Sequence, residues 1–438
     1  MSGEIFRLQE LYRTGRADPR EVVAEQLERA RTSAGAETAF SALFAVTATA
    51  EAEAAAVRIA RGAPRSVLDG VPVTVEDLLP AGDERASDDG PAEAEIVRRL
   101  RALGAVILGS TRLPPYGVRG AAVDNPWAAE PTGRVGGAAA TVAMGIGFAS
   151  LGIDACGSLR NQAAWCGTVG LKPTQGVLST EGAVPLVPTL DHIALLSRRV
   201  DDAGAVVAAL SGASRRAARP RPAPLRIGVV LPEATCPDVR WRCQEVLALL
   251  AREEAEIVPI EGLPLGAAAA AAITLLYAEA VEMHQTRLAP KWQVYGPAVR
   301  RRVLVGAAVG AADYVRARAV RAALRATWPG LLGDVGVDLV ATPTVPSGAP
   351  PEGWFPLGAA DLAAAVLSTS PFDLMGVPAV TVPIGSDATG LPVGLQIAGI
   401  AGQDERVLTA AARVEAVRGS WPAPPAFVDP LARLVSAR

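Results

Sequence analysis

A serine in a glycine-rich stretch is the residue of this chain best placed to do covalent chemistry. Ser158 lies within Gly152–Thr174, GIDACGSLRNQAAWCGTVGLKPT, directly after Gly157. A serine in a tight turn of small residues can present its hydroxyl beside several backbone N–H groups, and nucleophilic attack on an acyl carbon requires both. Glycine and serine are also ordinary turn formers, so a plain connecting turn is the alternative interpretation.

The composition predicts a globular protein and excludes several classes of partner. Of the 438 residues, 50% are apolar and 20% are charged, which is typical of a chain with a large core. The net charge is −3 and the basic residues are dispersed, so we expect neither nucleic acid nor a membrane as partner. The basic segment Ser214–Pro222 is short and interrupted by proline, as expected of a solvated linker.

The N-terminal segment and the apolar stretches favour a cytoplasmic protein. The first residues, MSGEIFRLQELYRTGR, are amphipathic and contain no apolar signal core. Apolar stretches such as Ala267–Leu276 are too short to span a bilayer. Neither secretion nor membrane insertion is therefore expected.

Metal and nucleotide sites are not expected either. The four cysteines match no zinc-binding spacing, and with two histidines in the whole chain a histidine-rich metal site is excluded. The glycine-rich segment 131–150 precedes a helix of small residues, but its glycines match neither the dinucleotide fingerprint nor the P-loop. We expect reduced thiols and no bound metal.

Helices and strands alternate along the chain, which predicts a layered α/β fold. In the first half, helical spacing over 3–33 is broken at Asp18-Pro19, a typical N-cap followed by proline at the first helical position. The other elements expected there are a helix over Thr47–Ala60, strands over Val71–Val75 and Ala105–Leu108, and a helix over Ala92–Leu103. The second half should contain strands over Leu225–Val230, Asp338–Thr342, Ala379–Pro383 and Gly394–Ala398, with helices over Asp238–Arg252, Leu265–Leu288, Tyr295–Thr327 and from Asp404.

A set of motifs in a fixed order resembles the amidase-signature family from about residue 5 to about residue 420. The motifs are LDGVPVTVEDL, GAVILGST, NPW at 125–127, the Ser158 stretch, VPLVPTLDHI, YGPAVRRRV with AADYVRAR, DLVATPT, and FDLMGVPAVTVPIG with GLPVGLQIAG. Each motif alone is weak, but the ordered set is specific.

The resemblance implies one α/β domain over 1–438, with a mixed central sheet covered by helices on both faces. Within it we expect a helical N-terminal part over 1–60, the signature core over 61–213, a linker-like loop over 214–224, and the second half of the sheet over 225–438. The resemblance also implies hydrolysis or transfer at an amide carbonyl by a Ser–cis-Ser–Lys triad, without a metal or an organic cofactor.

Part of the family's site is kept in this chain. The resemblance assigns the nucleophile to Ser158 and the brace of its loop to Asp154 and Arg160. The oxyanion donors map to the backbone N–H groups of Ala155, Cys156 and Gly157. Cys156 stands where the family usually has glycine, and because its Cβ restricts the backbone, we expect a reshaped oxyanion site.

The other two members of the triad are replaced by charged residues. In Gly70-Val-Pro-Val-Thr-Val-Glu-Asp77, Glu76 occupies the position of the family's lysine. Matching the serine loop through Pro131 and the glycines at 136 and 137 places Arg134 at the cis-serine position. Ser158 therefore faces Glu76 and Arg134 in place of the relay that would remove its proton.

These replacements argue against ordinary amidase turnover through Ser158. Arginine has a pKa above about 12 and no acceptor, so it cannot relay a proton. An exposed glutamate, with a pKa of about 4.3, is too weak a base to activate a serine at neutral pH. In unrelated hydrolases the loss of a triad member lowers the rate by about 10⁴- to 10⁶-fold.

Glu76 and Arg134 could form an ion pair beside Ser158, since a buried arginine is costly unless it is paired. Such a pair could be a structural salt bridge in a vestigial site. Alternatively, Arg134 binds a substrate carboxylate or enolate while Glu76 transfers a proton.

Three functions follow from these residues. Our first choice is a repurposed enzyme, such as one of a biosynthetic pathway, that acts on an amide- or acyl-containing small molecule. The second is a pseudo-amidase that binds a ligand or a protein partner, because some family members are the amide-hydrolysing component of tRNA amidotransferases. The third is a weak amide hydrolase that uses Ser158. A small molecule is the expected ligand, and a homodimer is compatible with the chain.

Overall fold

The computed structural model describes residues 3–432 except 83–92, 114–122, 129–132, 213–224, 254, 292–296, 351–361 and 363–364. The linker-like loop expected over 214–224 lies outside the described residues. The described elements alternate between helix and strand along the chain, as the sequence predicts.

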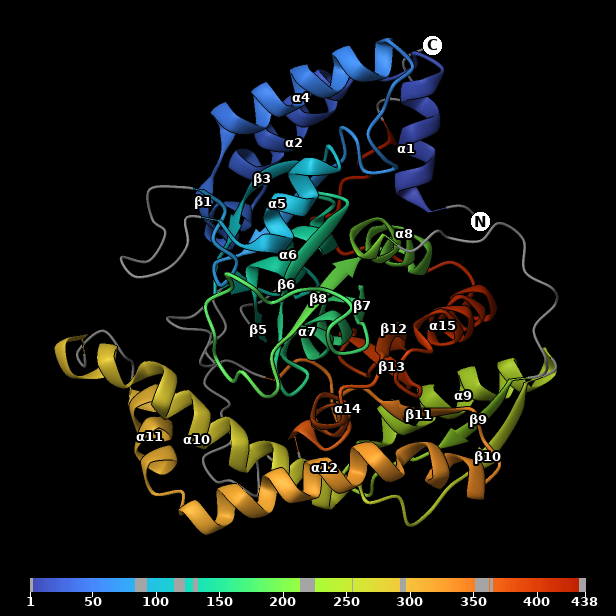
Figure 1. Ribbon diagram of the computed structural model, residues 1–438. Coiled ribbons are helices and arrows are strands. Elements are labelled where there is room, and N and C mark those ends of the chain that lie inside the picture. Colours follow the sequence, from blue (N-terminus) through green and yellow to red (C-terminus); the bar gives the residue numbers. More distant parts are fainter. Residues whose placement is uncertain are drawn as a thin grey trace.

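A mixed sheet runs through the molecule, in the order β1-β3-β2-β6-β8-β7-β12-β13-β11-β9-β10 (Figure 1). The strands are β1 (Phe40–Leu43), β2 (Pro72–Glu76), β3 (Val106–Thr111), β6 (Ala149–Asp154), β7 (Val169–Lys172), β8 (His192–Ser197), β9 (Arg226–Val229), β10 (Glu256–Pro259), β11 (Leu339–Pro343), β12 (Ala379–Ser386) and β13 (Pro392–Ala398). β2 is parallel to β3 and β6, whereas β8 is antiparallel to β6 and β7. The expected mixed central sheet is confirmed.

Helices cover both faces of this sheet, which confirms the predicted fold class (Figure 1). One face packs against α1 (Glu4–Arg13), α5 (Glu95–Ala102), α8 (Val200–Ser211), α9 (Pro237–Arg252) and α15 (Asp404–Arg418). The other packs against α2 (Pro19–Thr32), α3 (Ala36–Ala39), α4 (Ala45–Ala60), α6 (Gly137–Met144) and α7 (Ser158–Cys166), and, farther along the sheet, α10 (Leu265–Lys291), α12 (Ala311–Asp334) and α14 (Ser370–Met375). The neighbours Leu195 and Leu196 of β8 belong to the two opposite cores, because successive strand residues point to opposite faces.

Local sequence signals explain several element boundaries. Asp18 accepts a hydrogen bond from the Arg20 N–H at 2.8 Å and caps α2, with Pro19 at the first helical position, as predicted. The helix expected over Tyr295–Thr327 is instead two helices, α11 (Pro297–Ala307) and α12, and Gly310 is the N-cap of the second. Glycine has weak helix propensity, which favours a break at this point.

Among the residues that the structure describes, one helix is long and apolar enough to cross a membrane by length and composition alone. Leu265–Gln285 of α10 has a mean hydropathy of 1.4, and half of that stretch is buried inside the protein. Its buried residues, among them Ala272 and Leu275, share a core with Trp328 of α12 and Phe372 of α14. α10 thus packs as a core helix in this fold, and together with α11 and α12 it lies away from α1 and α4 (Figure 1).

The candidate site lies where β2 and β6 end. These neighbouring strands are parallel, so their carboxyl ends meet at the same edge of the sheet. Glu76 is the last residue of β2, and Asp154 is the last residue of β6. A three-residue turn, 155–157, then leads into α7, which begins at Ser158.

Candidate functional site

The turn between β6 and α7 has an unusual backbone. Cys156 has φ +56° and is the one non-glycine residue with a positive φ among those described. Gly157 follows with φ +86° and is the N-cap of α7. A residue with a side chain in this left-handed region costs roughly 1–2 kcal/mol relative to right-handed backbone. The backbone at Cys156, which we expect to be restricted by its Cβ, is therefore strained just before the serine.

Ser158 stands at the N-terminus of α7 with its hydroxyl held by backbone groups. Its Oγ donates to the Ile153 carbonyl oxygen at 3.1 Å and accepts a weaker hydrogen bond from the Ala155 N–H at 3.4 Å. Within the described part of the chain, no acceptor takes the Gly157 N–H. This N–H, next to the positive end of the α7 dipole, can bind a developing oxyanion.

Glu76 is buried, with 1% of its surface exposed. Its Oε2 accepts a hydrogen bond from the Ile153 N–H at 3.0 Å, and its Oε1 has no partner among the residues that the structure describes. A Cβ at Gly152 would lie 2.0 Å from Oε2, so the glycine makes room for the carboxyl group. Burial raises the pKa of Glu76 to about 8, because removal from water disfavours the charged form.

This burial corrects the premise that Glu76 is an exposed and weak base. A carboxylate with a pKa of about 8 binds a proton far more tightly than an ordinary glutamate does. It changes protonation state near neutral pH, which is the range that suits a general acid or base. A low pKa therefore does not prevent Glu76 from acting as a base.

Glu76 and Ser158 are hydrogen bonded to the same residue. Glu76 binds the N–H of Ile153, and Ser158 binds its carbonyl oxygen. In an extended strand, the N–H and C=O of one residue point to the same edge. The carboxyl group and the hydroxyl therefore lie along one edge of β6, the edge that faces β2.

Arg134 is described by its backbone alone. It lies in β5 (Arg134–Val135), which pairs with β4 (Val123–Asp124) so that Asp124 is opposite Arg134. β5 packs against α7, the helix that begins with Ser158. No described cation contacts the Glu76 carboxyl group. The ion pair between Glu76 and Arg134 stays a prediction.

Asp154 and Arg160 form a buried ion pair beneath the turn. Arg160 Nε donates to Asp154 Oδ2 at 2.9 Å, and the guanidinium group also binds Asp373 and Gln396. All four side chains are fully buried. Burial alone would lower the pKa of Arg160, but the carboxylates of Asp154 and Asp373 raise it above its ordinary value, so the arginine stays charged.

Sequence reasoning missed the partners that this arginine finds on distant elements. Asp373 belongs to α14 and Gln396 to β13, more than 200 positions along the chain from Arg160. Both lie inside family motifs, FDLMGVPAV and GLPVGLQIAG, but no local pattern indicates that they meet the Ser158 loop. A polar residue in an otherwise apolar strand, such as Gln396 in PVGLQIA, was the available signal.

Lys172 of β7 is a second buried cation, and it belongs to the same polar layer. Its Nζ donates to the carbonyl oxygens of Val377 at 2.6 Å and Pro173 at 3.1 Å. Burial lowers its pKa to about 8. Because its ammonium group is tied to backbone carbonyls within the core, Lys172 does not replace the missing lysine of the triad.

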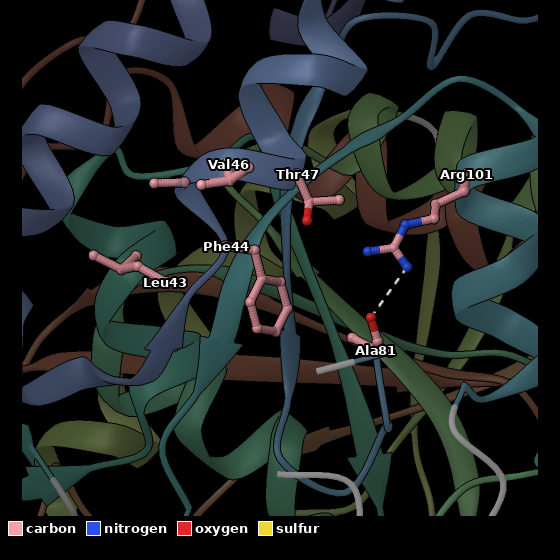
Figure 2. Close-up of a pocket in the computed structure, with 8 residues that line it drawn as sticks. Leu43, Phe44, Val46, Thr47, Ala81 and Arg101 are labelled. Atoms are coloured by element: carbon pink, nitrogen blue, oxygen red, sulfur yellow. Dashed lines mark hydrogen bonds between the residues drawn. The ribbon is translucent and has the colours of Figure 1, made fainter. Parts of the chain in front are cut away.

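A pocket of about 350 Å³ opens elsewhere on the molecule (Figure 2). It is lined by Leu43, Phe44, Ala45, Val46, Thr47, Ala81, Gly82 and Arg101. Arg101 donates to the Ala81 carbonyl oxygen and pairs with Glu51 and Glu93, so its charge is already compensated. None of the residues assigned to the Ser158 site lines this pocket.

No group of three or more histidine, cysteine, aspartate or glutamate side chains in the described ranges is arranged to hold a metal ion. All four cysteines are free thiols, and Cys236 is the exposed one.

Comparisons with known proteins agree with the ordered motifs and with the fold. The family model described as Amidase matches residues 21–408. One subunit of the glutamyl-tRNA(Gln) amidotransferase of Anaeromyxobacter sp. is 31% identical over 92% of this chain and 94% of its own length. The corresponding protein of Synechococcus elongatus is 30% identical over 89% of this chain and 92% of its own.

Solved structures are similar over nearly the whole chain. A crystal structure of an amidase has a TM-score of 0.83 and 33% identity, covering 95% of this chain and 99% of its own. The peptide amidase of Stenotrophomonas maltophilia has a TM-score of 0.76 and 26% identity, covering 95% and 97%. The fold, the motifs and these similarities together show that the chain belongs to the amidase family of hydrolases.

Proposed function

We propose that this protein is a repurposed amidase-family enzyme that acts on an amide- or acyl-containing small molecule, with Ser158 as nucleophile and Glu76 as proton carrier in place of the family's lysine. The observation that supports the proposal most is the shared residue Ile153, whose N–H binds Glu76 and whose carbonyl oxygen binds Ser158. A buried acid with a pKa of about 8 and a serine hydroxyl along the same strand edge can exchange a proton near neutral pH, directly or through one water.

In the proposed reaction, the ionised Glu76 takes the proton of the Ser158 hydroxyl, directly or through one water. The Ser158 oxygen attacks the carbonyl carbon, and the new oxyanion accepts a hydrogen bond from the Gly157 N–H. As the C–N or other acyl bond breaks, Glu76 returns the proton to the leaving group. The acyl group on Ser158 then passes to water or to a second nucleophile.

Arg134 has a separate role in this proposal. Arginine cannot accept a proton, but its guanidinium group binds carboxylates through two parallel hydrogen bonds. Since the backbone of Arg134 packs beside α7, a substrate with an acidic group near its reactive carbonyl fits this site. The small-molecule substrate, the homodimer and the cytoplasmic location that the sequence suggests stay predictions.

A fluorophosphonate probe tests the proposal, because it labels only a serine whose hydroxyl can lose its proton. We expect wild-type protein to be labelled at Ser158, with a rate that rises with pH through about 8 as Glu76 ionises. Glu76→Gln should lower the rate by at least 10²-fold, the low end of general base catalysis. Ser158→Ala should remove labelling.

Wild-type protein that is not labelled at any pH from 6 to 10 would overturn the proposal. Labelling that is independent of Glu76 would leave Ser158 as nucleophile but remove Glu76 from the mechanism. If labelled wild-type protein also releases ammonia from simple amides such as benzamide, the weak-amidase alternative holds instead.

A non-catalytic component of a protein complex is the second candidate function. Two facts favour it: the similar proteins of Anaeromyxobacter and Synechococcus are named as subunits, and no described side chain hydrogen bonds to the Ser158 hydroxyl. In that case Ser158→Ala would keep the full biological activity of the protein, measured as growth complementation of a deletion strain.

A further inference from the structure

We propose that Thr369 is a positioning residue that sets the direction of the Gly157 N–H, the oxyanion donor beside Ser158. This inference rests on the proposed function, in which the substrate carbonyl binds at this N–H. Thr369 is fully buried and is the N-cap residue of α14. Its Oγ1 donates a hydrogen bond to the Cys156 carbonyl oxygen at 3.1 Å.

The planar peptide group transmits this contact to the donor. The C=O of Cys156 and the N–H of Gly157 belong to one peptide unit, and in a trans peptide they point in opposite directions. Because Thr369 holds the carbonyl oxygen on the side of α14, the Gly157 N–H must point away from α14. No described residue accepts a hydrogen bond from that N–H, as expected of a donor kept for a ligand.

The turn needs such a restraint because the glycine at 157 tolerates more than one orientation of the peptide before it. Cys156 has φ +56°, a conformation that a residue with a Cβ rarely adopts. Rotation of the peptide between 156 and 157 leaves that φ unchanged, because it alters ψ of Cys156 and φ of Gly157, and it would turn the N–H towards α14. The hydroxyl of Thr369 opposes that rotation by binding the carbonyl oxygen in its present orientation.

The fit between the turn and α14 is close. A Cβ at Gly157 would lie 2.2 Å from both Cβ and Oγ1 of Thr369. The single hydroxyl proton of Thr369 also has the Val366 carbonyl oxygen within reach, but at 3.5 Å, so the Cys156 carbonyl is the better acceptor. The glycine allows the threonine to approach, and the threonine then fixes the peptide.

The buried ion network holds Thr369 in place from its other side. The Thr369 carbonyl oxygen lies 3.4 Å from both Nη1 and Nη2 of Arg160, which pairs with Asp154 and Asp373. Thr369 thus connects the charged brace under α7 with the turn that carries the oxyanion donor.

The test compares two variants of Thr369. Thr369→Val keeps the shape of the side chain but loses its hydroxyl, whereas Thr369→Ser keeps the hydroxyl. We expect Val to slow fluorophosphonate labelling of Ser158 by about 10²- to 10³-fold, the effect of losing one oxyanion donor. Ser should restore the rate to within a few-fold of wild type. For a substrate, the change should appear in kcat with KM nearly unchanged, because the donor acts mainly on the transition state.

Ser370→Ala is the matched control. Ser370 is the next residue, is equally buried, and donates from its Oγ to the Val366 carbonyl oxygen at 2.9 Å. Its removal also deletes one buried hydroxyl of α14, but without touching the oxyanion turn, so the labelling rate should stay at the wild-type value. Melting temperatures of all three variants separate a local effect from general destabilisation.

A Thr369→Val variant that labels at the wild-type rate would overturn the proposal. If wild-type protein is itself not labelled, the proposed function fails, and a crystal structure of Thr369→Val then decides the positioning claim alone. An unchanged orientation of the 156–157 peptide in that crystal would refute it, whereas a rotated peptide would support it.

Discussion

Glu76 holds one carboxyl oxygen on the Ile153 N–H and leaves the other without a partner inside the described part of the protein. Glutamate in water is a weak base, and the removal of water around this side chain raises its pKa to about 8. The free oxygen can accept a proton without breaking an existing hydrogen bond. At the scale of the residue, the chemistry of the position is therefore set by burial.

The pH dependence of stability reports this burial. The folded protein holds a proton on Glu76 that the unfolded chain releases above a pKa of about 4.5, so the contribution of this group to stability falls as pH rises from about 4.5 to about 8. In the Glu76→Gln variant the side chain cannot ionise, so this position no longer loses stability as the pH rises. Relative to wild type, we expect the variant to gain stability across this range, by at most roughly 5 kcal/mol.

Urea unfolding at pH 5 and pH 8.5 measures this difference. The exposed Glu53 of α4 supplies the control. Glu53→Gln should change the free energy of unfolding by the same amount at the two pH values. An equal stability difference between wild type and Glu76→Gln at both pH values would show that Glu76 is not protonated in the folded state.

The combined substitution Glu76→Lys with Arg134→Ser returns the family's residues to the triad positions. If the scaffold keeps its ancestral geometry, the variant should release ammonia from benzamide at a rate at least 10²-fold above wild type, because a base and a relay are both present again. The same variant with Ser158→Ala should be inactive. A folded double variant that is inert would show that the substrate pocket has diverged as well.

At the scale of the elements, the site is a junction of a strand end, a strained turn and two helix N-termini. β6 ends at Asp154, α7 begins at Ser158, and α14 begins beside them at Ser370. The junction has no room for a side chain at two of its glycines, because Gly152 of β6 lies against Glu76 and Gly157 of the turn lies against Thr369. These glycines allow close approach of elements, and their role is steric.

Gly152→Ala tests the contact between β6 and β2. The new Cβ would lie 2.0 Å from Glu76 Oε2, so either the strand or the carboxyl group must shift. We expect a loss of about 1–3 kcal/mol in the free energy of unfolding, measured by chemical denaturation. In a Glu76→Ala background the same change should cost little, because the clashing group is absent.

Gly266 provides the contrasting position, since a Cβ there would meet nothing within 4 Å. As this glycine is the second residue of α10, Gly266→Ala should raise the stability of the protein slightly, by at most about 1 kcal/mol. Equal destabilisation at both positions would contradict the steric argument.

At the scale of the whole molecule, the Arg160 network joins distant parts of the chain. Arg160 on α7 meets Asp154 of β6, Asp373 of α14 and Gln396 of β13. The first two elements come from the first half of the chain and the last two from its second half. A buried charge network of this kind specifies how the two halves of the sheet meet.

Arg160→Leu should be among the most destabilising single changes in the protein. It leaves two buried carboxyl groups without their cation, which costs about 3–5 kcal/mol, measured as a fall in unfolding free energy. The exposed pair of Arg316 with Asp313 is the control, and Arg316→Ala should change stability by less than about 1 kcal/mol. If both variants lose a similar amount of unfolding free energy, the buried network does not stabilise the protein more than an exposed ion pair does.

The sequence by itself determined the fold family and most of the elements. The alternation of helix and strand, the Asp18-Pro19 cap and the ordered motifs depend on residues close together in the chain, so they can be read without coordinates. The position of Glu76 and the serine after Gly157 were likewise identified from their motifs.

The tertiary structure alone decided what these residues can do. The buried carboxyl group of Glu76 binds the N–H of Ile153, 77 positions away, and the restraint on the Cys156 carbonyl comes from Thr369, 213 positions away. From the sequence, Glu76 is expected to have the pKa of an exposed side chain, and no local pattern points to Thr369. Desolvation and hydrogen-bond direction depend on neighbours in space, and long-range folding brings these neighbours together.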